Sequence, residues 1–180
     1  QERVEIGPNM TAGELHDQLM YTGADLLVKT VEAMAVGDYP LQDQGGLLAG
    51  REPKHAPKIF KEDMKVDWSL GVDAIFNHIR GLSPFPTAWT EFRNKKNGEI
   101  VSLKIFETER IVKDHGKEVG LSTDNKTYLD VLVKGGVIRI KELQLSGKKR
   151  MKTEEFLRGF HVINLLCVSG EKLCEGRSLG

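Results

Sequence analysis

The chain has 180 residues, 26 basic and 26 acidic side chains, and 39% apolar residues. A chain of this length can hold one medium domain, or one small domain plus part of another. No apolar run is long enough to cross a membrane, and no basic-then-apolar leader supports secretion.

The cysteines Cys167 and Cys174 both lie in the last segment, without a nearby His/Cys cluster. We therefore expect reduced thiols in a cytoplasmic protein, with no metal site and no disulfide framework.

Zero net charge conceals an uneven distribution along the chain. Residues 1–92 carry 8 Lys/Arg and 14 Asp/Glu, whereas residues 93–152 carry 15 and 8. A basic module beside an acidic one favours a polyanionic partner on the basic side. A solvated β surface with scattered lysines would give the same count, so charge alone leaves both interpretations open.

The first segment is predicted to be a strand followed by a long helix. Residues 3–6 alternate apolar and polar side chains, which predicts a short strand. Thr11 and Glu14 have the spacing of a capping box, and apolar residues recur at nearly helical period to about Val36. His16 and the Asp that follows it are interpreted as structural, because nothing nearby supplies a nucleophile.

This strand and helix cannot bury both faces of a sheet by themselves. We therefore predict that residues 1–43 are the C-terminal remnant of a larger α/β domain, and a chain that starts at Gln1 is consistent with a fragment. Residues 44–60 are rich in Gly and Pro and lack periodicity, so we predict an interdomain linker there.

A short helix is predicted next, because apolar residues at Val72, Ile75, Phe76 and Ile79 lie three and four apart. Ser69 is expected to be the N-cap residue of this helix.

The same helix is expected to end at Gly81 in a left-handed conformation. Pro84 and Pro86 prevent any continuation.

From Ala88 onward the pattern predicts β structure. Five short strands are expected, separated by turns at 94–98, 115–116, 124–125 and 135–136. A short helix from Thr153 to Arg158 follows, with Thr153 as its possible cap. Periodicity alone fits either a small closed barrel or an open antiparallel sheet.

Three segments carry a family resemblance. The first, VDWSLGVDAIFNHIRGLSPFPTAW, is similar to the signature that opens the C-terminal domain of methionyl-tRNA formyltransferases. The matching residues are Val66, Asp67, Trp68, Ala74, Ile75, Asn77, Ile79, Arg80, Gly81, Pro84 and Pro86. The second, residues 145–160, resembles the end of that domain, and the third, residues 11–19, resembles the last long helix of the catalytic domain.

The resemblance implies an OB-fold-like all-β barrel with flanking short helices at residues 61–160, behind the α/β remnant. It implies the C-terminal part of an enzyme that transfers formyl from 10-formyltetrahydrofolate to the methionine of initiator methionyl-tRNA. No residue of the chain matches the family's catalytic Asn, His and Asp, so no catalytic residue is assigned and no cofactor is expected on this chain. The expected partners are initiator tRNA and an N-terminal catalytic domain in cis, in an enzyme that is a monomer and is not bound to a membrane.

Basic side chains at three places are candidate phosphate contacts. The candidates are Lys54, Lys58 and Lys61 near the linker, Lys104 in the β region, and Lys148, Lys149, Arg150 and Lys152 after the last predicted strand. Flexible cations can follow a phosphate backbone without reading bases, and poor aromatic interleaving near the last cluster favours structured RNA over single strands.

Two other functions remain open at this level. One is the C-terminal domain of a related formyltransferase that acts on a small molecule, such as a nucleotide-sugar amine, or of a formyltetrahydrofolate-dependent dehydrogenase. The other is a non-enzymatic OB-fold RNA-binding module, against which the strand and helix of residues 1–43 argue. Residues 161–180 do not match the family and form a divergent tail, with a possible strand at 162–168 and disorder expected at 170–180.

Overall fold

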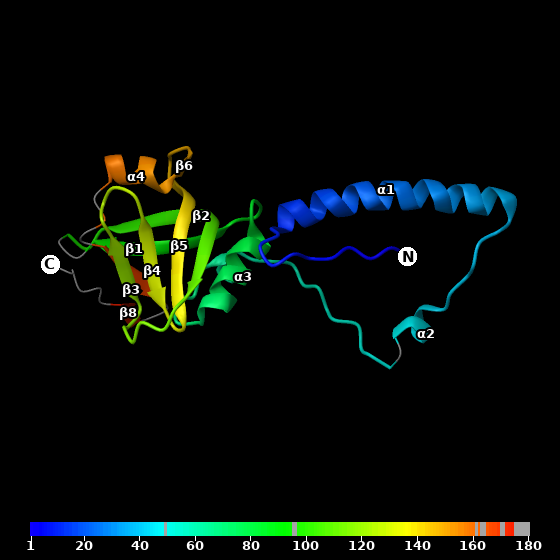
Figure 1. Ribbon diagram of the computed structural model, residues 1–180, viewed down its shortest axis with the longest axis horizontal. Coiled ribbons are helices and arrows are strands. Elements are labelled where there is room, and N and C mark those ends of the chain that lie inside the picture. Colours follow the sequence, from blue (N-terminus) through cyan, green and yellow to red (C-terminus); the bar gives the residue numbers. More distant parts are fainter. Residues whose placement is uncertain (49, 95–96, 161, 163–164, 170–171, 175–180) are drawn as a thin grey trace.

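The computed structural model describes residues 1–48, 50–94, 97–160, 162, 165–169 and 172–174. Figure 1 shows a curled antiparallel sheet with short helices around it, and a long helix that extends away from this body. The elements are α1 Ala12–Val36, α2 Gln44–Leu48, the 3₁₀-helix η1 Glu62–Met64, α3 Val72–Leu82, β1 Ala88–Asn94, β2 Ile100–Val112, β3 Gly120–Thr123, β4 Leu129–Val133, β5 Gly136–Leu145, β6 Arg150–Lys152, α4 Thr153–Gly159, β7 Leu165–Ser169 and β8 Lys172–Cys174.

The strands form one antiparallel sheet in the order β3-β4-β5-β2-β1-β7-β8, with β6 paired to β5. The register between β2 and β5 shifts around Glu107, where irregular pairing bends the ladder. The two ends of the series approach each other, because β3 lies close to β7. The prediction of a β-rich domain with short flanking helices is therefore confirmed.

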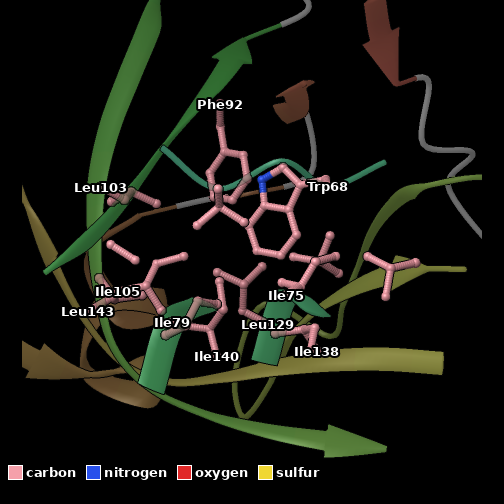
Figure 2. Packing of buried hydrophobic residues seen from close by; sticks show 14 of the residues in the cluster. Trp68, Ile75, Ile79, Phe92, Leu103, Ile105, Leu129, Ile138, Ile140 and Leu143 are labelled. Atoms are coloured by element: carbon pink, nitrogen blue, oxygen red, sulfur yellow. The ribbon is translucent and has the colours of Figure 1, made fainter. Parts of the chain in front are cut away.

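The apolar core lies inside the curled sheet and beneath α3. One face of this helix is buried, and its buried residues are Val72, Ile75, Phe76, Ile79 and Leu82. Figure 2 shows Ile75 and Ile79 with the indole of Trp68 among aliphatic side chains from the strands. Trp68 and Thr90 are fully buried, and the indole Nε1–H donates to the Thr90 hydroxyl at 2.8 Å. The polar atom of the largest fully buried side chain is thereby satisfied.

Helix α1 has the predicted capping box. The Thr11 hydroxyl accepts from the Glu14 amide at 3.2 Å, and a Glu14 carboxylate oxygen accepts from the Thr11 amide at 2.7 Å. The Thr11 amide, and then the Thr11 hydroxyl, donate to the Glu14 carboxylate and lower the pKa of Glu14. The helix ends at Gly37, whose φ of 77° is left-handed, and no side chain of the helix is buried. Many of its large apolar residues, among them Leu27 at 64% exposure, face solvent.

The predicted strand at residues 3–6 is wrong, because this segment is not in regular structure. A strand needs a hydrogen-bonded neighbour, and none of the described strands pairs with this segment. Of the predicted strand and helix, only the helix is therefore present. The predicted linker also contains a short helix, α2.

The predicted ends of α3 are wrong as well. Gly71 is the N-cap, and the first-turn amide of Val72 donates to the Lys134 carbonyl at 3.0 Å. The Ser69 hydroxyl instead donates to Asp67 Oδ1 at 2.7 Å. Gly81 lies inside the helix, which continues to Leu82 and ends at Ser83 with an ordinary φ of −91°.

Thr153 is not the cap of α4, because Lys152 occupies that position and makes no side-chain cap hydrogen bond. The Thr153 hydroxyl donates to the Ile140 carbonyl at 2.5 Å, and this hydrogen bond connects α4 to β5. Strand β6 immediately before it was not predicted.

In the tail, the strand predicted over 162–168 corresponds in part to β7, and the disorder expected at 170–180 is wrong for β8. The rest of 170–180, and Lys95 and Lys96 in the predicted 94–98 turn, lie outside the described residues.

Replacing Thr90 tests the buried hydrogen bond. Thr90→Val keeps the shape of the side chain but leaves the Trp68 indole N–H without its acceptor, so we expect a loss of about 1–3 kcal/mol in the free energy of unfolding, measured with urea. Thr90→Ser keeps the hydroxyl and removes a methyl group, which should cost about 0.8 kcal/mol. A Ser variant less stable than the Val variant would contradict this account.

The turn between β3 and β4 is organised by the Asp124 carboxylate. Its Oδ1 accepts from the amides of Lys126 at 2.9 Å and Thr127 at 2.8 Å, and its Oδ2 accepts from the Thr127 hydroxyl at 2.6 Å. The Thr127 hydroxyl, followed by the backbone donors, holds the pKa of Asp124 well below its usual range.

This lowered pKa predicts a pH-dependent contribution to stability. The contribution is present above the unfolded-state pKa, about 3.9, and is lost as the pH falls toward the lower folded-state pKa. The difference in Tm between the wild type and Asp124→Asn should therefore be largest near neutral pH and narrow below about pH 4. Thr127→Val removes one hydrogen-bond donor to Asp124, so it should lower Tm by less than Asp124→Asn does, and this difference should also narrow at acidic pH. An equal Tm difference at neutral and acidic pH would contradict the prediction.

Candidate nucleic-acid interface

Five residues from five segments form a line across the outer face of the sheet, which we call the transverse row. Its members, each paired with the next, are Lys65, Trp89, Lys104, Gln144 and Arg150. Directly opposed residues on neighbouring strands share a face. The buried neighbours Ala88, Leu103 and Leu143 point inward, so the transverse row points outward.

Trp89 stands between two lysines and the end of the linker. Its Nε1–H donates to the Lys61 carbonyl at 2.8 Å. The ammonium groups of Lys61 and Lys65 lie 5.4 Å and 4.9 Å from the ring centroid. Each is within the range of a cation–π interaction. The indole therefore holds two cations and the preceding chain against β1.

Acidic side chains neutralise only part of this surface. Lys65 pairs with Glu91 at 2.7 Å, and Arg150 pairs with Glu142. Lys61 and Lys104 have no carboxylate within ion-pair distance among the described residues. The surface therefore keeps an excess of positive charge, which suits a polyanion.

The other end of the transverse row is bordered by the turn between β5 and β6. Gln144 Nε2 donates to the Lys148 carbonyl at 2.8 Å, which places this turn beside the transverse row. The Arg150 guanidinium lies 4.3 Å from the Phe106 ring centroid. Lys148 and Lys149 are both exposed in this turn.

The structure thus brings together some of the predicted contacts and separates others. Lys104 and Arg150, which lie far apart in the sequence, are both members of the transverse row, and Lys61 lies beside the row over the Trp89 ring. Lys152 is two pairs further along the β5–β6 ladder, opposite Glu142. Lys54 is exposed, and Lys58 lies over the Phe60 ring at 5.6 Å, so neither is brought to the transverse row by a described contact.

Sequence reasoning missed Lys65, Trp89 and Gln144. Trp89 follows the first residue of the predicted β region, and the alternating burial along β1, which turns it outward, is the signal that could have identified it. The pairing of Lys104 with both Trp89 and Gln144 depends on two strand registers, and no local pattern reveals it.

The signature residues have structural roles in this domain. Asp67 Oδ1 accepts from the Ser69 amide at 2.9 Å, and Asn77 Oδ1 accepts from Arg80 Nε at 2.7 Å. Pro84 and Pro86 follow α3 and both have cis peptide bonds. Together with buried Trp68 and with Gly81 inside α3, these residues shape the helix and its exit.

Two other features, a metal-binding cluster and a membrane span, are absent from the described part of the chain. No group of three or more His, Cys, Asp or Glu side chains is arranged to hold a metal ion there. None of the helices in that part combines the length and the apolar character needed to span a membrane.

Comparison with known proteins gives a consistent family. The family model for the formyl transferase C-terminal domain matches residues 58–161. Methionyl-tRNA formyltransferase of Phocaeicola vulgatus is 44% identical over 162 residues, which are 89% of this chain and 50% of that protein. The Bacteroides fragilis protein of the same name is 42% identical over 163 residues, with 90% and 50% covered. The chain thus spans about half the length of these curated relatives.

Changing Trp89 separates its two roles. Trp89→Phe keeps a ring but loses the N–H bond to Lys61, so we expect a loss of about 0.5–1.5 kcal/mol in the free energy of unfolding. Trp89→Leu also removes the ring beneath two ammonium groups, for a further loss of about 0.5–1 kcal/mol.

Phe85→Leu is the matched control for the Trp89 variants, because Phe85 is 84% exposed. It should change stability by less than about 0.5 kcal/mol. If urea unfolding showed Trp89→Leu to be more stable than Trp89→Phe, the result would contradict the cation–π role of Trp89.

Proposed function

This chain belongs to the formyl transferase C-terminal domain family, and we propose that it is the C-terminal part of a methionyl-tRNA formyltransferase that binds initiator methionyl-tRNA. The parent enzyme would transfer formyl from 10-formyltetrahydrofolate to the methionine amino group. The names of the similar proteins and the transverse row both support this proposal.

The transverse row is the observation that carries the RNA-binding part of the proposal. The row presents Lys104 and Arg150 on one outward face. Lys61 lies beside it over Trp89, and the flexible Lys148 and Lys149 lie in the adjacent turn. Separated cations of this kind suit the phosphates of a folded RNA, because they follow the backbone and require no access to base edges. Lys54, Lys58 and Lys152 remain proposed secondary contacts.

In this proposal the chain contributes positioning and no chemistry. Phosphate contacts along the transverse row would hold the RNA so that its aminoacylated end reaches a separate catalytic domain, and orientation of this kind lowers the entropic part of the barrier. No residue is assigned to catalysis or to binding of the formyl donor, so the chain alone should not form formyl-methionyl-tRNA. The parent enzyme is proposed to be cytoplasmic and monomeric.

We also propose the OB-type barrel as the fold of residues 61–160, with residues 1–43 belonging to the catalytic domain, 44–60 to the linker and 161–180 to a divergent tail. The curled sheet, the approach of β3 to β7 and the position of α3 beside the sheet support this division.

The alternative substrate class is a small molecule, such as a nucleotide-sugar amine. It would leave the exposed cations of the transverse row without a function. A stand-alone RNA-binding module is less consistent with relatives that are about twice as long as this chain.

The proposal is tested by initiator tRNA binding across a series of salt concentrations. The logarithm of affinity for a duplex falls with the logarithm of salt by about 0.9 per neutralised phosphate. Changing Lys61, Lys104 and Arg150 together to Ala should therefore reduce the slope by about 2–3.

The matched control changes Lys113, Lys117 and Lys126 to Ala, because all three are exposed in loops away from the transverse row. It removes the same charge and should alter the slope by less than about 1. Equal effects of the two triple variants would contradict the transverse row as the contact surface. Absence of wild-type binding at low salt would contradict the tRNA proposal itself.

A further inference from the structure

The N-terminal segment and the β domain meet at a small polar and steric contact, which we call the α1–α3 joint. It comprises Arg80 and the chain leaving α3 on one side, and the turn before α1 with the first turn of that helix on the other. Figure 1 shows α1 extending away from the sheet beyond this point. Because no side chain of α1 is buried, apolar burial does not set the direction of the helix.

Arg80 supplies the polar half of the joint. Its Nη1 donates to the Met10 carbonyl at 2.7 Å and to the Gly7 carbonyl at 3.4 Å. Its Nε donates to Asn77 Oδ1 at 2.7 Å, which orients the guanidinium from within α3. A planar guanidinium can make these contacts at once, whereas an ammonium group lacks the fixed fork of donors.

Gly13 supplies the steric half. Its amide donates to the Ser83 carbonyl at 3.0 Å. A Cβ at position 13 would approach Pro84 Cδ closer than 3.0 Å, a separation that real Cβ atoms essentially never show. The proline ring cannot rotate away as a long side chain would. The helix backbone therefore packs directly against Pro84, and only glycine permits this approach.

The far side of the joint is tied to the β domain by further hydrogen bonds. The Ser83 hydroxyl donates to the Phe106 carbonyl of β2 at 2.7 Å, and the Thr87 amide donates to the Leu82 carbonyl at 2.9 Å. The surface that receives α1 is thereby attached to the same strand that carries Lys104 of the transverse row.

We propose that the α1–α3 joint sets the orientation of the N-terminal segment relative to the transverse row, with Arg80, Gly13 and Pro84 as positioning residues. This inference rests on the proposed function for its consequence in catalysis: the joint aligns RNA held on the transverse row with the catalytic domain to which α1 belongs. The geometric part stands independently, because it concerns two segments of this chain.

The two glycines of α1 provide a matched pair of variants. Gly13→Ala and Gly23→Ala make the same change in the same helix, and both replace a poor helix former with a good one. A Cβ at position 23 meets nothing within 4 Å, whereas at position 13 it meets Pro84. Any difference between the variants therefore reports the contact and not helix propensity.

The geometric test is a distance distribution between spin labels, measured by pulsed electron paramagnetic resonance. Labels are attached at Lys29→Cys on α1 and Glu154→Cys on α4, after both native cysteines are changed to Ser; positions 29 and 154 are exposed. Gly13→Ala should shift or broaden the distribution, and Gly23→Ala should leave it unchanged. Identical distributions for the two variants would overturn the proposal.

A second-site change identifies the contact that is responsible. Pro84→Ala removes the ring atom that the new methyl group meets, so adding Gly13→Ala should have little further effect in that background. An equal additional shift with and without Pro84 would overturn the steric part. Arg80→Lys keeps the charge and serves as a second variant if Gly13→Ala folds poorly. This change should also broaden the distance distribution between the labels. An unchanged distribution would overturn the polar part of the proposal.

The catalytic consequence is measured in the full-length enzyme at equal concentrations of folded protein. Gly13→Ala should lower kcat by about tenfold to a hundredfold, as expected for a small misplacement of reactants, while the salt slope of tRNA binding remains that of the wild type. Gly23→Ala should change neither. A normal kcat accompanied by an altered label distance would overturn the role of the joint in catalysis. A wild-type enzyme that binds tRNA but transfers no formyl would instead contradict the proposed function, and the label distances would still test the joint.

Discussion

The β domain depends on the packing of one amphipathic helix and one tryptophan against the inside of a curled sheet. α3 contributes an apolar face, and Trp68 fills the space beside it without leaving its indole N–H unpaired, because Thr90 accepts from it. A buried donor without a partner would cost free energy that a small core cannot easily offset. The hydrogen bond also joins the segment before α3 to β1, so the helix and the first strand are positioned together.

That packing decides what the outer face presents. In a strand the side chains alternate between faces, so burial of Ala88, Leu103 and Leu143 turns Trp89, Lys104 and Gln144 outward. A slip of one residue in β1 or β2 would place charged groups in the core and break the transverse row. The apolar interior and the basic exterior are therefore two results of the same strand registers.

The polar contacts at the C-terminal end of α3 also position the N-terminal segment against the β domain. The buried face of α3 fixes the helix, and half-buried Arg80 beside that face donates to the backbone of the turn before α1. The short helix thus both covers the core and receives α1. In the proposed enzyme, a firmly packed α3 would be needed both for holding RNA and for directing it toward the catalytic domain.

The sequence by itself determined the local features of this protein. The capping box of α1, the apolar face of α3 and the turns between β2 and β5 follow from patterns within a few residues, and the family resemblance followed from a contiguous signature. Tertiary structure alone decided where α3 begins, because the Lys134 carbonyl, and not Ser69, pairs with its first turn. It also decided that residues 3–6 form no strand, since a strand requires a neighbour. The transverse row could not be read from the sequence, because its members are brought together by long-range strand pairing, and local patterns carry no information about register between distant strands.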